Sequence, residues 1–203
     1  MFFSKDDFKK YYQPKPEPTL LDVPSMTYIV INGSGDPNGE EFAQATEALY
    51  SVSYAVKMSY KKPNPPEGYY EYKVFPLEGE WGLVDPNLPL TDKSNYSYKL
   101  MIQQPDFLTP ELFKAFLAET KLKKKNPKLD PLSFETIADG LCCQMLHVGP
   151  FDSEPTSFAI MRAFCEQQGY QRQSKTHKEI YLSDPRKTAP EKMKTILRFQ
   201  VGK

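Results

Sequence analysis

An imidazole, a carboxylate and a phenol alternate along the segment 177–182. Successive side chains of a β-strand point to opposite faces, so we expect His177, Glu179 and Tyr181 to share one face. A carboxylate held among rings can act as a general base or attract a cation. The alternative is a solvated outer face, which is common in antiparallel sheets but usually carries Lys, Thr and Arg. The residues alone leave a functional site and an outer face both open.

Aromatic residues supply further candidates for a ligand site. Trp81 is the only tryptophan, and Gly79 and Gly82 flank it closely. Glycines let a backbone or a flat ligand approach a ring, so we interpret Trp81 as a ligand contact, although a single tryptophan is more often a core residue. Several tyrosines are amphipathic rings that can serve either role, and three are taken as ligand-binding candidates: Tyr54, Tyr72 and Tyr98.

The sequence gives weak support for a phosphate-binding loop, a metal site or a cysteine nucleophile. The segment Gly33–Gly35 lacks the Gly-Lys-Ser/Thr that completes a phosphate-binding loop. Two histidines and three cysteines lack the spacing of a zinc site, so we predict no metal and no cofactor. Cys142 and Cys143 lie in an apolar strand-like segment without an activating partner, so a cysteine nucleophile is not expected.

Composition narrows the class of partner. The 203 residues carry 26 basic and 26 acidic side chains, so no net field favours nucleic acid or an anionic membrane. The lysine-rich run 121–125 is interpreted as the solvated end of a helix. Three cysteines, a charged N-terminus and no long apolar segment predict a cytoplasmic protein, monomeric or homodimeric, with a small-molecule partner.

The order of predicted elements suggests a duplication. Prolines at 14, 16 and 18 predict an extended leader over residues 1–18, and residues 19–203 form a single domain. A strand, a Gly/Asp/Pro turn, a helix and further strands occur twice, about 115 residues apart. We therefore predict an α+β fold made by tandem duplication of a strand-helix-strand-strand unit, with repeats at about 19–125 and 126–203 and a ligand groove between the two halves. The predicted strands are 26–32, 69–77, 97–103, 141–148, 177–182 and 195–201. Two predicted helices begin near Glu40 and Pro110, and a third carries one apolar stripe from Phe158 to Gln168 and stops at Gly169.

Three segments resemble a known family. Residues 147–155 (HVGPFDSEP), 168–170 (QGY) and 177–186 (HKEIYLSDPR) resemble the GyrI-like small-molecule-binding family, and residues 101–109 (MIQQPDFLT) resemble its stand-alone branch. The resemblance implies a ligand groove in which the buried glutamate, here Glu179, receives cationic drugs inside an aromatic cage. The stand-alone branch includes cyclopropanoid hydrolases. Phe151 stands where many relatives carry tyrosine.

The resemblance leads to a specific expectation. The protein takes up flat, hydrophobic, often toxic molecules and hydrolyses an electrophilic cyclopropane with Glu179 and Tyr181 as catalytic residues. Ligand contacts are expected from Trp81 and the tyrosines above, and also from His147, Phe151 and His177. The alternative is a multidrug-type binding or sequestering module without catalysis. Inhibition of a protein such as DNA gyrase follows only from the family's name.

Overall fold

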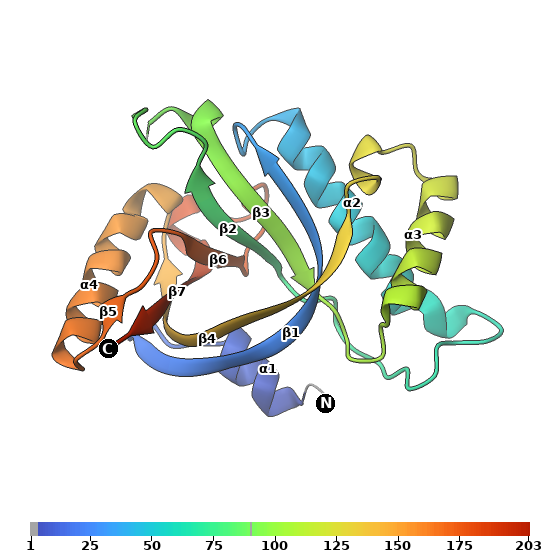
Figure 1. Cartoon of the computed structure of the whole chain (residues 1–203), viewed down its shortest axis with the longest axis horizontal. Helices are drawn as coiled ribbons and strands as arrows, with labels where there is room; N and C mark the ends of the chain where they lie inside the picture. The colour runs from blue at the N-terminus through green and yellow to red at the C-terminus, as the bar shows by residue number, and fades with distance from the viewer. Residues whose placement is uncertain (1–3, 90) are drawn as a thin grey trace. The chain divides into compact units, whose positions relative to one another are not determined.

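The computed structural model describes residues 4–89 and 91–203 and has helices packed on antiparallel strands (Figure 1). This confirms the predicted α+β class. The long strands β1 (Thr19–Ser34) and β4 (Ser133–Val148) each contribute residues to two compact units. The first unit comprises residues 26–77 and 83–137, and the second comprises residues 4–25, 78–82 and 138–203.

In the first unit, helices pack on a pair of strands. Residues 28–34 of β1 pair antiparallel with residues 97–103 of β3 (Tyr96–Gln103). Helix α2 (Glu40–Lys57) buries the apolar stripe expected from the sequence, and α3 (Pro110–Lys123) lies beside α2 (Figure 1). The buried residues of α2 are Ala45, Ala48, Leu49, Val52, Ser53 and Val56.

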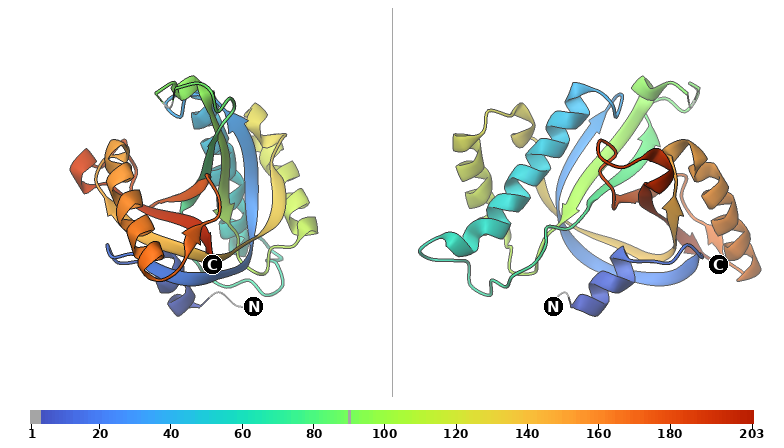
Figure 2. Two further views of the ribbon diagram at one scale, coloured as in Figure 1. Left: turned by 60° about the vertical axis from the view of Figure 1, so that its left-hand side comes forward. Right: turned by 180° about the vertical axis from the view of Figure 1, so that it is seen from behind.

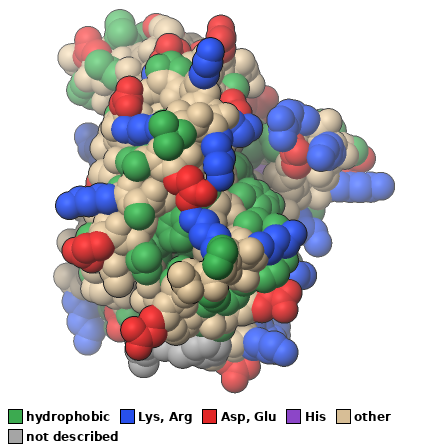
Figure 3. Space-filling model, turned by 90° about the vertical axis from the view of Figure 1, so that its right-hand side faces the viewer, with side chains coloured by type: hydrophobic (Ala, Val, Ile, Leu, Met, Phe, Trp, Pro, Cys, Tyr) green, Lys and Arg blue, Asp and Glu red, His purple; other side chains and the backbone are tan. Residues whose placement is uncertain are grey.

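The start and end of α3 follow from local signals. The Thr109 hydroxyl accepts a hydrogen bond from the Leu112 amide, and Pro110 occupies the first turn. The lysine-rich run closes the helix, and its side chains form ion pairs that include Lys121 with Asp130 and Lys123 with Glu119. The prediction of a solvated helix end is confirmed, and the face in Figure 3 shows acidic and basic side chains interspersed.

One predicted strand of this region is wrong. The segment 69–76 forms no strand, and β2 (Leu77–Leu83) begins only where that prediction ended. Aromatic residues favour strands because they pack well on a pleated surface. Here they pack around a single ring instead: the centroids of Tyr69, Tyr70 and Tyr72 lie 5.1, 5.6 and 6.0 Å from that of Phe107.

In the second unit, β7 (Lys194–Gly202) has several partner strands. It pairs antiparallel with residues 142–148 of β4, with β6 (His177–Tyr181) and with β5 (Gln171–Arg172), while β2 is the other neighbour of β6. Helix α4 (Glu154–Gln167) lies beside these strands (Figure 2). Its apolar face packs into a core that includes Cys143, Phe158, Met161, Cys165, Leu197 and Phe199.

The predicted extended leader is wrong at α1 (Lys5–Tyr12), which is helical. The Ser4 hydroxyl accepts a hydrogen bond from the Asp7 amide at 3.1 Å, and the Asp7 carboxylate accepts one from the Ser4 amide at 2.9 Å. This capping box satisfies two amides that would otherwise lack partners, and the prolines act only after the helix has ended.

Short 3₁₀ helices connect several elements: Met58–Lys61, Lys93–Asn95, Pro127–Leu129, Phe151–Ser153 and Pro190–Lys192. Within residues 4–89 and 91–203, no helix combines the length and the apolar character needed to cross a membrane.

Candidate functional site

Strand β6 is buried on both faces. Glu179 is only 9% exposed, and its neighbours Lys178 and Ile180 are also buried. A strand between β2 and β7 has no free edge, so its backbone polar groups are satisfied by the sheet while its side chains enter the interior. The alternative of a solvated outer face is therefore wrong at Glu179.

Four side chains of this unit form a continuous hydrogen-bonded chain. The Trp81 Nε1–H group donates to the Tyr181 hydroxyl at 2.7 Å, and that hydroxyl donates to Glu179 Oε2 at 3.0 Å. Glu179 Oε1 lies 2.9 Å from His177 Nε2. Both carboxylate oxygens of Glu179 thus have partners that hold the group in one orientation. This arrangement brings Trp81 together with His177, Glu179 and Tyr181, the three residues predicted to share one face of a strand.

Tyr181 is a hydrogen-bond donor to the carboxylate at physiological pH. Burial, followed by the negative charge of Glu179, raises the pKa of Tyr181 well above that of a free phenol. The phenol therefore keeps its proton. Its ring also meets Phe151 edge to face, with centroids 6.0 Å apart, so Phe151 joins the predicted cluster.

Glu154 is a member of this cluster that the sequence reasoning missed. It begins α4, and its side chain is only 6% exposed. Burial, followed by the charge of Glu179, raises the pKa of Glu154 to about 9. In the sequence, Glu154 precedes Pro155 at the start of a helix. An acidic residue at such a position usually lies in solvent and complements the helix dipole, so the sequence is only a weak signal of a buried carboxyl group.

The cluster contains donors that suit a divalent cation. One donor atom from each of Glu154, His177 and Glu179 lies within 4.8 Å of the others. Imidazole and carboxylate are common ligands of zinc and other transition metals. The sequence spacing does not reveal this trio, because α4 and β6 meet only in the folded chain.

The opposite side of β6 is anchored by a buried ion-pair network. Lys178 Nζ lies 2.7 Å from Asp139 Oδ2 and 3.4 Å from Glu78 Oε2. Glu78 also accepts a hydrogen bond from the Tyr12 hydroxyl at 2.6 Å. A pocket of about 70 Å³ adjoins this network and reaches His177.

His147, whose role as a ligand contact stays a prediction, makes local hydrogen bonds. It is buried, and its Nδ1 lies 2.8 Å from the Ser157 hydroxyl. Its Nε2 lies 3.1 Å from the Pro150 carbonyl oxygen and 3.2 Å from the Ser153 hydroxyl. These contacts hold the turn that precedes α4, which positions Glu154 for the cluster.

The three predicted tyrosines belong to the first unit and make their contacts there. Tyr54 is 51% exposed on α2, and Tyr98 is buried against Phe42. A side chain at Gly33 would collide with the Tyr98 ring, which identifies Tyr98 as a packed core residue. Tyr72 belongs to the aromatic cluster around Phe107.

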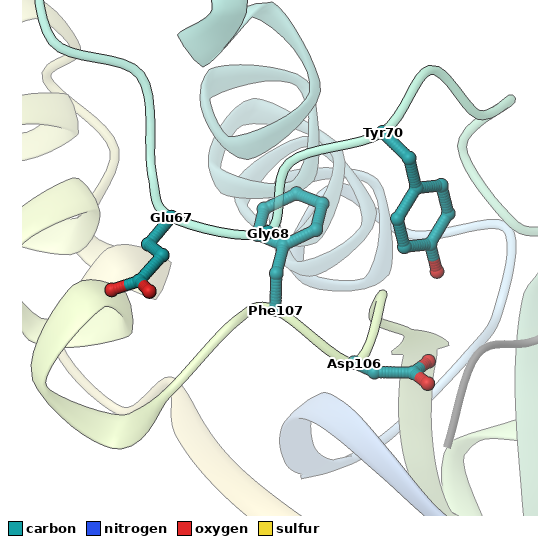
Figure 4. A pocket seen from close by; sticks show the side chains of 5 residues that line it. All are labelled: Glu67, Gly68, Tyr70, Asp106 and Phe107. Atoms are coloured by element: carbon teal, nitrogen blue, oxygen red, sulfur yellow. The ribbon is translucent and has the colours of Figure 1, made fainter.

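The first unit also has a hollow of about 310 Å³ beside this aromatic cluster. In Figure 4 the Phe107 ring stands next to Gly68, and Tyr70 and Asp106 line the same hollow. Burial, followed by the charge of Asp106, raises the pKa of Tyr70 to about 12. The remaining lining residue is Glu67.

The cysteines are poor nucleophiles, as the sequence predicted. All three are buried free thiols. Burial raises the pKa of Cys142 to about 12, and it also raises the pKa values of Cys143 and Cys165. The reactive thiolate is therefore scarce at neutral pH.

The α+β fold holds the buried carboxylate of Glu179 in a hydrogen-bonded chain with Tyr181 and Trp81. Residues 16–201 match the GyrI-like small molecule binding domain, so the chain belongs to this family. No curated protein matches the sequence.

Solved structures of high similarity come from Listeria innocua. An uncharacterized conserved protein is 38% identical, with a TM-score of 0.91 and coverage of 98% of both chains. Two structures described as hydrolases are 37% and 38% identical, with TM-scores of 0.88 and 0.90 and the same coverage.

Proposed function

We propose that this protein binds flat, hydrophobic, cytotoxic molecules and hydrolyses an electrophilic cyclopropane with water activated by Glu179. The carboxylate accepts a proton from water as the water oxygen bonds to a ring carbon. The strained C–C bond breaks, and its electron pair moves into a conjugated carbonyl group, which takes a proton from solvent. The product is the substrate plus one water.

The observation that carries this proposal is the fixed, buried carboxylate of Glu179. Among the described residues, no Lys or Arg lies within ion-pair distance of it, and its partners are His177 and Tyr181. A positioned general base contributes about 10²–10⁴-fold to rate. The hydrolase descriptions of two relatives at 37% and 38% identity support the same class of reaction.

The second candidate is a binding or sequestering module without turnover. Among the described residues, Glu179 has no Lys or Arg partner, and this also favours binding of an organic cation at its carboxylate. A desolvated cation on an aromatic face gains about 2 kcal/mol. This candidate also fits the family's description as a small-molecule-binding domain.

Oxygen-isotope labelling separates turnover from binding. Wild-type protein is incubated in ¹⁸O-enriched water with a neutral, cyclopropane-bearing alkylating compound. Hydrolysis predicts a product that gains one labelled water, with a yield that exceeds the amount of protein. Recovery of unchanged compound bound to the protein would support sequestration. A single adduct on the protein mass would show alkylation of the protein and would contradict both candidates.

We also infer that the repeats at about 19–125 and 126–203 descend from one duplicated strand-helix-strand-strand unit. In support, a helix follows a long strand in each repeat: α2 follows β1, and α4 follows β4. The repeat boundaries and the ligand groove expected between the repeats remain predictions.

A further inference from the structure

Three side chains of the second unit bring metal-binding atoms to one place. Glu154 begins α4, whereas His177 and Glu179 belong to β6. One donor atom from each residue lies within 4.8 Å of the others. One imidazole and two carboxylates make three protein ligands, which is the number that a zinc site with one open position uses.

The spacing of the donor atoms fits a transition-metal ion. Zinc binds nitrogen and oxygen donors at about 2.0–2.2 Å, so two of its ligand atoms are about 2.8–3.6 Å apart. His177 Nε2 and Glu179 Oε1 are already 2.9 Å apart. A neutral imidazole can carry its proton on Nδ1, which frees Nε2 to coordinate an ion. Glu154 supplies the third donor from within 4.8 Å, so this side chain has to approach by at most about 2 Å.

The Glu154 carboxyl group gives an independent sign of a ligand. Glu154 is only 6% exposed, and its Oε1 is buried without a hydrogen-bond partner among the described residues. A buried polar atom without a partner costs free energy, and a ligand that binds the atom removes that cost. The carboxyl group therefore suits a partner that it lacks within the described chain.

The charges around the site favour a divalent cation. Among the described residues, neither Glu154 nor Glu179 has a Lys or Arg within ion-pair distance, and Lys178 is directed to Asp139 and Glu78. The hydroxyl that donates to Glu179 is uncharged. A divalent ion would balance both carboxylates, whereas a monovalent ion would balance only one.

His177 is oriented by its neighbours and can be reached from solvent. The Phe158 ring meets the imidazole edge to face, with centroids 4.7 Å apart and planes at 68°. The His177 side chain is still 22% exposed, and it lines the pocket of about 70 Å³ described above. An ion can therefore approach the imidazole while the two carboxylates stay buried.

We propose that Glu154, His177 and Glu179 bind one divalent transition-metal ion, for which zinc is the best match. Magnesium and calcium prefer sites made of oxygen donors, whereas zinc accepts imidazole together with carboxylate. Bound zinc would occupy the Glu179 carboxylate that accepts a proton in the proposed hydrolysis, so zinc should inhibit ring opening. This consequence rests on the proposed function, but the binding of zinc does not.

Calorimetric titration of the wild-type protein with zinc chloride tests the site. A chelator first removes any bound metal, and dialysis then removes the chelator. We expect saturable binding of one Zn²⁺ per chain that persists in excess Mg²⁺, because magnesium does not favour an imidazole ligand. Absence of saturable zinc binding would overturn the inference.

Variants of the proposed ligands locate the bound zinc. Loss of an outer-shell partner typically weakens metal affinity by about 10–100-fold, so loss of a ligand itself should weaken it by about 100-fold or more. We expect this result for Glu154→Gln and for His177→Phe. Glu166→Gln, at an exposed position of α4, should bind zinc as the wild type does. Unchanged zinc affinity in folded Glu154→Gln and His177→Phe proteins would refute the site.

Diffraction locates the ion without any variant. In zinc-soaked crystals of the wild-type protein, an anomalous peak should lie about 2.0–2.2 Å from His177 Nε2 and from one carboxylate oxygen of each glutamate. Peaks found only at cysteine sulfurs or at exposed carboxylates would contradict the proposal.

Ring-opening assays separate the metal site from the proposed hydrolysis. Turnover by metal-free protein that zinc abolishes and a chelator restores would support both. Zinc binding at the trio without turnover by metal-free protein would refute the free Glu179 base and leave the metal site intact. Turnover by metal-free protein that binds no zinc would refute the metal site alone. Turnover only in the presence of zinc would support the metal site and refute the inhibition.

Discussion

At the scale of single residues, the orientation of Glu179 depends on Tyr181 and Trp81. The Tyr181 hydroxyl donates a hydrogen bond to the Glu179 carboxylate, and its oxygen accepts a hydrogen bond from the Trp81 indole N–H. Because burial and the Glu179 charge raise the pKa of Tyr181, this direction of donation holds across the physiological range. A hydroxyl at this position therefore fixes both neighbours at once.

Trp81 should report ligand entry through its fluorescence. It is the only tryptophan, and its indole N–H bonds directly to Tyr181, so a ligand that contacts the cluster alters its surroundings. We expect titration with a planar aromatic compound to change the emission. Tyr181→Phe should shift the emission of the free protein because the indole loses its acceptor, whereas Tyr54→Phe, at an exposed position, should not. Calorimetrically detected binding without any change in emission would place the ligand elsewhere.

At the scale of elements, buried ion pairs on the face of β6 opposite Glu179 hold this strand in position. Lys178 neutralises Asp139 and Glu78, and Arg198 Nη1 lies 3.7 Å from Asp139 Oδ2. These buried charges connect β6 to β2, β4 and β7. The network holds the strand that carries Glu179 while contributing no group to the carboxylate's own hydrogen bonds.

Loss of Lys178 should destabilise the protein strongly. Lys178→Met keeps much of the side chain's length but leaves Asp139 and Glu78 without their cation. Removing one partner of a buried ion pair typically costs about 3–5 kcal/mol of unfolding free energy. Urea denaturation measures this loss, and Lys175→Met, at an exposed position, serves as the control. A change of less than about 1 kcal/mol in Lys178→Met would contradict the anchoring role.

At the scale of the whole molecule, features that depend on local sequence patterns were predicted better than features that depend on long-range contacts. Strand alternation correctly placed His177, Glu179 and Tyr181 together because that pattern depends only on neighbouring residues. Glu154 was missed because its approach to Glu179 depends on how α4 packs against the strands. The ligand contact predicted for Tyr98 stays a prediction, because a buried amphipathic ring suits both a core and a ligand site. The α1 helix was missed although Ser4 followed by Asp7 is a capping signal.

The central claim is that Glu179 acts as the base of a hydrolase, and Glu179→Gln tests it most directly. The substitution preserves size and hydrogen-bonding shape but removes the proton acceptor. We predict that turnover of a cyclopropane-bearing substrate falls by about 10²–10⁴-fold while affinity for a neutral substrate stays within a few-fold. Glu166→Gln should retain wild-type rates. Ring opening at an undiminished rate in Glu179→Gln would contradict the account.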